Sequence, residues 1–121
     1  MLNHIVLMGR LTNDPELRTT QNGAAVATFT LVCDRDFKPQ NGQREADFIN
    51  CVAWRGVAEF TERNFVKGQL AAVSGRLQIR SYEKEGQRHT VSEVVVDNIY
   101  FAGPKPGTKE VEEADDEELP F

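Results

Sequence analysis

The stretch DFINCVAWRGVAEFTERNFVKG, residues 47–68, contains two hydrophobic periods in succession and decides the predicted fold. Residues 47–55 alternate between two sets of side chains, as the residues of a strand do. From Val57 to Lys67 the apolar positions recur along one side of a helical wheel instead. Gly68 is a natural stop for that helix. The stretch therefore predicts a strand followed by one amphipathic helix of about three turns.

Four other segments have the composition of strands, at residues 4–11, 24–33, 70–82 and 89–101. Turn signals separate the segments, at Asp14-Pro15, Asn22-Gly23, Asn41-Gly42 and Gly86. The predicted order is three strands, one helix and two strands. This is the layout of an OB-fold, whose strand face and loops bind oligonucleotides or sugars. We therefore predict a mainly β protein, a five-stranded Greek-key barrel with one helix between the third and fourth strands, although other small α+β folds share parts of this layout.

Alternation along the strands separates a predicted core from a predicted surface. On the third strand, Ile49, Cys51 and Ala53 form the core set. On the fourth strand, the inward set is Val73, Gly75, Leu77 and Ile79, and the outward set is Arg76, Gln78, Arg80 and Tyr82. Cys33 and Cys51 are interpreted as small core residues, not as a disulfide framework. Phe60 and Phe65, from the apolar stripe of the helix, are also predicted to be core.

The net charge of −5 is concentrated at one end of the 121-residue chain. Residues 105–121 contain two lysines and seven acids, whereas residues 1–104 contain twelve bases and twelve acids. We predict one domain over residues 1–103, a short disordered linker over 104–114 and an acidic tail that ends the chain. The last seven residues are Asp115, Asp116, Glu117, Glu118, Leu119, Pro120 and Phe121. Because a solubilising tail does not need an apolar tripeptide, we predict a partner-binding tip here, with a purely solubilising tail as the alternative.

The outward strand faces offer the flat rings and cations that hold an unpaired nucleic-acid strand. The candidate stacking rings are Phe37, Phe48, Trp54 and Tyr82. The candidate cations for phosphate groups are Arg10, Arg18, Arg35, Lys38, Arg55, Lys67, Arg76, Arg80, Lys84 and Arg88. Phe48 and Trp54 could instead cap the barrel or fill a subunit interface. His4 and His89 are interpreted as strand surface.

Enzyme and membrane signatures are missing from the sequence. It contains no phosphate-cradling glycine loop, no nucleophile elbow and no ligand spacing typical of a metal site. We therefore predict a protein that is not an enzyme and needs no metal or cofactor. The longest uninterrupted apolar run is four residues, too short to span a bilayer, and no signal-peptide pattern opens the chain. A cytoplasmic location is expected.

Taken together, these motifs resemble the bacterial single-stranded DNA-binding proteins. The resemblance begins with Val6–Leu11, Asp14–Arg18, Gly23 and Val26–Leu31. It continues through Asp47–Trp54, Val66–Gly68, Gly75–Leu77 and Arg80–Tyr82, and the last seven residues resemble that family's partner-binding tip. The resemblance covers the whole chain.

The resemblance implies a homotetramer that wraps single-stranded DNA without sequence preference, at the nucleoid. It implies that the tip recruits replication, recombination and repair proteins. It assigns base stacking to the four rings named above and backbone contacts to Lys67, Arg76 and Arg80, with Arg18 at a basic position after the Asp-Pro-Glu turn. Gln78 stands where a relative may have Arg. Many members have a long linker rich in Gly, Pro and Gln, which this chain lacks.

Two other functions stay open at this point. One is an OB-fold adaptor of the primosome type that binds proteins and has little DNA affinity of its own. The four candidate rings argue against it, because an adaptor does not need them on a basic strand face. The other is RNA binding, since nothing in the sequence reads a 2′-hydroxyl. The choice of DNA over RNA depends on the resemblance alone.

Overall fold

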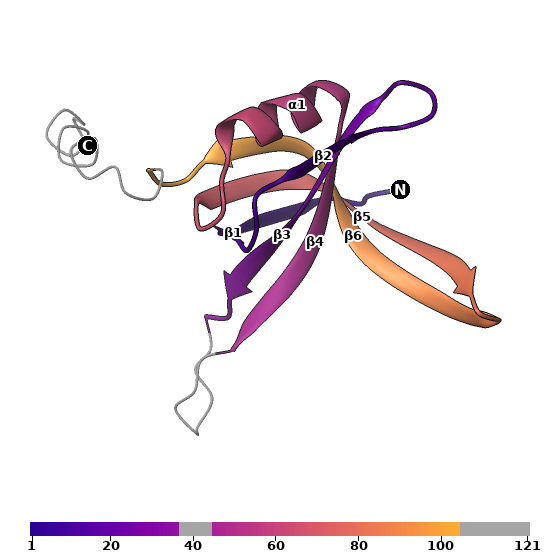
Figure 1. The fold of residues 1–121 in the computed structure, drawn as a ribbon. Coiled ribbons are helices and arrows are strands. Elements are labelled where there is room, and N and C mark those ends of the chain that lie inside the picture. The colour runs from indigo at the N-terminus through magenta and orange to yellow at the C-terminus, as the bar shows by residue number, and fades with distance from the viewer. Residues whose placement is uncertain (37–44, 105–121) are drawn as a thin grey trace, which may run out of the picture.

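The computed structural model describes residues 1–36 and 45–104, which form six strands and one helix (Figure 1). In chain order the elements are β1 (Ile5–Leu11), β2 (Glu16–Thr19), β3 (Ala25–Asp34), β4 (Ala46–Trp54), α1 (Arg55–Asn64), β5 (Leu70–Lys84) and β6 (Gln87–Phe101). The predicted linker beyond Pro104, the acidic tail and the Asn41-Gly42 turn lie outside the described residues.

Five of the strands close into a ring, in the order β1, β5, β6, β4 and β3, with β3 returning to β1 through the Leu11–Leu31 pair. The strands of this ring are antiparallel except for β4 and β6, which run parallel because the chain passes through α1 and β5 between them. The core fills the ring, with Leu31, Ala53, Val73 and Val94 fully buried. The predicted OB-fold barrel, with its helix between the third and fourth predicted strands, is confirmed.

The strand β2 was not predicted. It pairs with β3, outside the closed ring, from Glu16 opposite Thr28 to Thr19 opposite Ala25. All four of its side chains are exposed, so this short strand has no buried set that would produce a hydrophobic alternation. The hairpin signal at Asn22-Gly23 does mark the turn into β3, where Gly23 has a φ of 86°.

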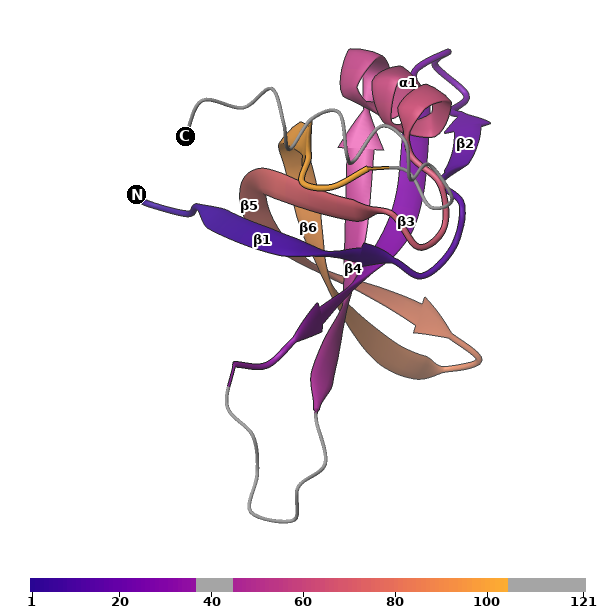
Figure 2. The ribbon, with the colours of Figure 1, turned by 90° about the vertical axis from the view of Figure 1, so that its left-hand side faces the viewer.

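The helix α1 covers one end of the barrel and packs against β2, β3, β4 and β6 (Figure 2). The prediction that it continues to Lys67 is wrong, because it ends at Asn64. Phe65 leaves the helix with extended backbone and turns its ring into the core, where it is 1% exposed and stacks on Phe101 with ring centroids 4.7 Å apart. Gly68 therefore serves a later turn, at a φ of 87°, and does not terminate the helix.

Phe60 is only partly covered, so its assignment to the core is wrong. Its ring meets Phe65 and Phe101 edge-on, with both centroid distances at 6.1 Å, and it is 38% exposed.

The outer parts of β5 and β6 form a hairpin that projects away from the barrel in both views (Figures 1 and 2). A bulge begins this region, since Ser74 faces Asn98 but Gly75 faces Val96. The prediction that Leu77 and Ile79 point into the core is wrong: among the described residues no second layer covers this part of the hairpin, and Ile79 is 61% exposed. The hairpin closes at Glu85 and Gly86, whose φ values of 54° and 78° suit a two-residue turn with the right-handed strand twist.

Candidate nucleic-acid interface

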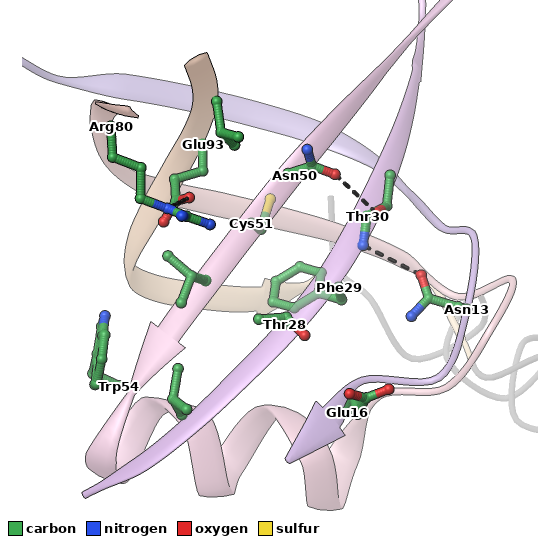
Figure 3. Close-up of a pocket in the computed structure, with 13 residues that line it drawn as sticks. Asn13, Glu16, Thr28, Phe29, Thr30, Asn50, Cys51, Trp54, Arg80 and Glu93 are labelled. Carbon is green, nitrogen blue, oxygen red and sulfur yellow. Dashed lines mark hydrogen bonds and ion pairs between the residues drawn. The ribbon is translucent and has the colours of Figure 1, made fainter. Parts of the chain in front are cut away.

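The outer face of β3 and β4 combines polar with apolar side chains, whereas the inner face of both strands is hydrophobic. Alternation puts Cys51 and Ala53 in the core and turns Asn50 outward, beside Thr30 on β3. The Thr30 hydroxyl donates to Asn50 Oδ1 at 3.3 Å, and the Thr30 N–H donates to Asn13 Oδ1 at 3.3 Å (Figure 3). These contacts arrange a row of small hydrogen-bonding groups along the surface.

Two of the predicted rings lie on this outer face, toward the two ends of β4. Phe48 is 70% exposed and Trp54 is 43% exposed. Neither ring caps the barrel of the single chain, because the strand turns both of them away from the buried set. Trp54 is also the residue before helix α1, and its backbone is extended, with φ −121° and ψ 145°. Phe37, the third predicted ring, lies outside the described residues.

The strand register aligns each of these rings with a predicted cation. Arg10 on β1 faces Val32 on β3, which faces Phe48. At the other end of the face, Arg18 on β2 faces Val26, which faces Trp54. Residues that pair across strands point to the same side of a sheet. The unpredicted strand β2 therefore brings Arg18 into the same row as Trp54.

A cleft of about 480 Å³ lies over this face and continues toward the hairpin (Figure 3). It is lined by Asn13, Glu16, Val26, Thr28, Phe29, Thr30, Asn50, Cys51, Val52, Trp54, Arg80, Val91 and Glu93. The cleft is open and its lining mixes hydroxyl, amide and charged groups with apolar ones. Its shape and chemistry suit an extended chain better than a compact small molecule, which prefers an enclosed apolar pocket.

Three of the candidate arginines are held by carboxylates of the same chain. Arg80 Nε donates to Glu93 Oε1 at 2.8 Å, inside the cleft, and Glu93 is only 12% exposed. Arg18 Nε donates to Glu16 Oε1 at 2.7 Å. Such pairs orient the guanidinium groups, and they also mean that a phosphate must compete with a carboxylate for each arginine.

Arg35 makes the most extensive of these pairings, at the far ends of β3 and β4. Its guanidinium donates to both carboxylate oxygens of Asp47 and, through Nη1, to Glu45 at 2.8 Å. The hydrogen bonds from Arg35 lower the pKa of Asp47, and the same bonds, with the charges of Asp47 and Glu45, raise the pKa of Arg35.

The remaining predicted cations of the described residues are not part of the cleft lining. Arg10 Nη1 donates to the Gly68 carbonyl at 3.1 Å, and Arg76 projects from the outer face of β5. Lys67 is exposed in the turn after α1, where its N–H donates to Asp14 Oδ1 at 2.8 Å. Arg55 opens the helix with a φ of 56°, beside Trp54. Lys38 and the seven residues of the predicted tip lie outside the described residues.

Tyr82, the fourth predicted ring, is on the projecting hairpin and exposed. It faces His89 across the two strands, and the rings stack with centroids 5.3 Å apart and planes 24° apart. His89, Glu93 and Asn13 were not predicted as site residues from the sequence, in which His89 was interpreted as strand surface. Alternation along β6 could have found the first two, because His89, Val91 and Glu93 share one face of that strand.

Thiol and metal chemistry find no support in the described residues. Burial and the neighbouring Cys33 raise the pKa of Cys51 to about 12, and burial with Asp47 and Asp34 raises the pKa of Cys33. Such thiols stay protonated and unreactive at neutral pH. Within residues 1–36 and 45–104, no three or more His, Cys, Asp or Glu side chains gather closely enough for a metal ion. No helix there combines the length and apolar character needed to cross a bilayer.

The fold and the cleft define a class: a small OB-fold protein whose candidate ligand face is an open strand surface of mixed polarity with exposed aromatic rings. Comparison with known protein families shows which family within that class the chain belongs to. The chain belongs to the single-strand binding protein family, whose family model matches residues 2–102.

Relatives of known name agree with this family over most of the chain. The chain is 59% identical over 108 residues to single-stranded DNA-binding protein A of Bacillus subtilis (strain 168), an alignment that covers 88% of this chain and 63% of the relative. It is 56% identical over 106 residues to the single-stranded DNA-binding protein of Halalkalibacterium halodurans, covering 87% and 63% of the two chains. Single-stranded DNA-binding protein 1 of Staphylococcus aureus (strain MSSA476) is 57% identical over 106 residues, covering 87% and 68%. The alignments with the first two therefore span less than two thirds of those proteins.

Proposed function

We propose that this protein binds single-stranded DNA without sequence preference, in the cleft over β3 and β4 and along the β5–β6 hairpin. The observation that carries the proposal is the exposure of Phe48 and Trp54 on this strand face, each in register with an arginine. Exposed rings beside cations on an OB-fold surface are the groups on which successive bases of a single strand can stack. The names of the Bacillus and Halalkalibacterium relatives support single-stranded DNA as that ligand.

Binding would combine stacking with charge neutralisation. Bases stack on Phe48, Trp54 and Tyr82, and each stacked base is worth roughly 1–3 kcal/mol whatever its identity, because every base has a π-face. Phosphates meet arginines at the rim of the cleft. Glu93 holds Arg80 through Nε, which leaves the two terminal nitrogens of that guanidinium to donate to the nucleic acid. Coating of exposed strands during replication, recombination and repair would follow from such binding, at the nucleoid, with no catalytic step.

Self-association into a homotetramer is part of the proposal. On one side β1 pairs with β5, and among the described residues its pairing with β3 begins only at Arg10. The earlier part of β1 therefore has an open edge, which is a template for pairing with another chain. Val6 and Met8 point outward from the same strand and are exposed, as is Tyr100 on β6. These apolar side chains give a second copy a surface to cover.

The acidic tip, residues 115–121, is proposed to recruit partner proteins. Its four carboxylates precede Leu119-Pro120-Phe121, so a fitting partner has a basic rim around an apolar pocket. Deleting residues 113–121 should abolish partner recruitment and should modestly raise DNA affinity at low salt, because the tail is itself a polyanion. Pull-down and titration of the truncated chain check this. Recruitment that survives the deletion would contradict the role of the tip.

The emission of Trp54, the single tryptophan, tests DNA binding against the adaptor alternative. Addition of oligo-dT should quench this emission in a saturable way, because a base stacks on the exposed ring. An adaptor that binds only proteins would leave the emission unchanged. The same titration with oligo-rU compares RNA with DNA, and we expect the tighter binding with DNA.

A further inference from the structure

We propose that His89 forms, with Tyr82, a two-ring platform that holds a base of the bound strand at the outer end of the cleft. This inference depends on the proposed DNA binding and adds a residue to it. The observation is the stack between the two rings, whose centroids lie 5.3 Å apart with planes inclined by 24°.

The platform faces the same side as the cleft. From the barrel outward, the paired residues on this face of the hairpin are Gln78 with Glu93, Arg80 with Val91, and Tyr82 with His89. Arg80, Val91 and Glu93 line the cleft. The ring pair is therefore the next step along the same surface, one cross-strand pair beyond Arg80.

His89 gives Tyr82 a support that the fold does not otherwise supply. The hairpin projects from the barrel (Figure 1), and the side chains of Arg80 and Tyr82 on this face of it are exposed. An unsupported Tyr side chain in such a place rotates among several rotamers, and ordering it on binding would cost affinity. Stacking on His89 orders the Tyr82 ring in advance, as aromatic cross-strand pairs do. The stack also extends the π-surface beyond one ring.

The alternative is that the stack of Tyr82 on His89 only stabilises the hairpin and does not contact DNA. A double-mutant cycle separates the two roles. His89→Val keeps a strand-forming side chain and removes the ring, and His89→Phe restores a ring that is neutral at every pH. Thr90→Val is the matched control, because Thr90 is adjacent on β6 but pairs with Ser81 on the opposite face of the hairpin. The measurement is oligo-dT affinity from Trp54 emission, at several salt concentrations, with melting temperature recorded for each variant.

We expect His89→Val to weaken oligo-dT binding about 3- to 10-fold, the range of an aromatic pair, with an unchanged salt slope since no charged contact is lost. His89→Phe should bind within about twofold of wild type, and Thr90→Val should match wild type. In the Tyr82→Ala background, His89→Val should have little further effect. Wild-type affinity of His89→Val, equal weakening by Val and Phe, or full additivity with Tyr82→Ala would each overturn the platform while leaving wild-type DNA binding intact. Absence of wild-type binding would overturn the proposed function itself.

Discussion

At the scale of single residues, the exposed rings differ from the buried ones in what they should contribute. Trp54 lies on the outer face of β4, whereas Phe65 is 1% exposed between α1 and the barrel. Burial of a ring of this size stabilises the fold, and truncation inside a core costs about 3–5 kcal/mol. Exposure of a ring leaves its face available to a ligand. An aromatic side chain thus has a structural role in one place and a proposed binding role in the other.

Trp54→Ala and Tyr82→Ala should each weaken binding of oligo-dT by roughly 1–3 kcal/mol while the melting temperature stays near that of wild type. The reason is that both side chains are exposed and neither fills the core. Fluorescence anisotropy of a labelled oligo-dT and thermal unfolding measure the two effects; anisotropy is needed because the first variant removes the only tryptophan. Phe65→Ala is the control: because Phe65 fills the core, this variant should lower the melting temperature. If Trp54→Ala loses binding only because it unfolds, the ring is structural.

The Arg35–Asp47 pair makes a prediction about pH. Because the hydrogen bonds from Arg35 lower the pKa of Asp47 in the folded state, the folded protein holds this proton less tightly than the unfolded chain does. The stability that the pair contributes is therefore complete above the ordinary carboxylate range and is lost as the pH falls through the lowered pKa of Asp47. Thermal unfolding of wild type and Asp47→Asn against pH checks this. The two curves should converge in acid, and a constant gap down to the most acidic pH would contradict the prediction.

At the scale of elements, the junction between barrel and hairpin depends on Gly75. A Cβ built at this position would collide with the backbone carbonyl of Val95 on β6. Gly56, in the first turn of α1, has open space around the same position. The effects of a glycine-to-alanine substitution at the two positions can therefore be compared directly.

Gly75→Ala should destabilise the protein and weaken oligo-dT binding, because β5 and β6 must separate locally and the hairpin that presents Arg80 and Tyr82 is displaced. Gly56→Ala should instead stabilise it slightly, by about 0.5–1 kcal/mol, since Ala is the better helix former. Denaturant unfolding and oligo-dT titration of the two variants make the comparison. Normal binding by Gly75→Ala would mean that the hairpin does not depend on the close approach.

The sequence predicts the elements of this fold better than it predicts their ends and their surroundings. Alternation over 47–55 identified the outward rings correctly, because a strand fixes the direction of each side chain. It failed for Leu77 and Ile79, since alternation does not reveal that the hairpin leaves the barrel and loses its second layer. The helix end was missed because Phe65 satisfies the helical period but packs better from an extended backbone.

The candidate site was predictable by residue type but not by partner. The arginines were selected as phosphate contacts from their charge, from outward strand positions such as those of Arg76 and Arg80, and from the family resemblance. Their pairing with Glu16, Glu93 and Asp47 depends on which strands meet, and a strand as short as β2 has no pattern to show it. The row from Arg18 to Trp54 follows from the same unpredicted strand. Long-range register is the information that a single sequence does not express.

At the scale of the whole molecule, DNA affinity should fall linearly with salt concentration on logarithmic axes, with a slope near −0.7 for each phosphate that is neutralised on a single strand. Arg80→Ala should make the slope shallower by about that amount, because Arg80 lines the cleft. Arg63→Ala, on the exposed surface of α1 and outside the cleft lining, should leave it unchanged. Titrations of the three proteins at several salt concentrations measure the slopes. An affinity independent of salt would contradict the proposed role of the cations.

The central claim is that the outer face of β3 and β4, together with the projecting hairpin, binds an unpaired DNA strand through its exposed rings. Ultraviolet cross-linking of oligo-dT to the full chain, followed by mass spectrometric mapping of the modified residues, tests it most directly. We predict cross-links at Phe48, Trp54 and Tyr82. Cross-links confined to the apolar surface around Met8 and Tyr100, with none on these three rings, would contradict the claim.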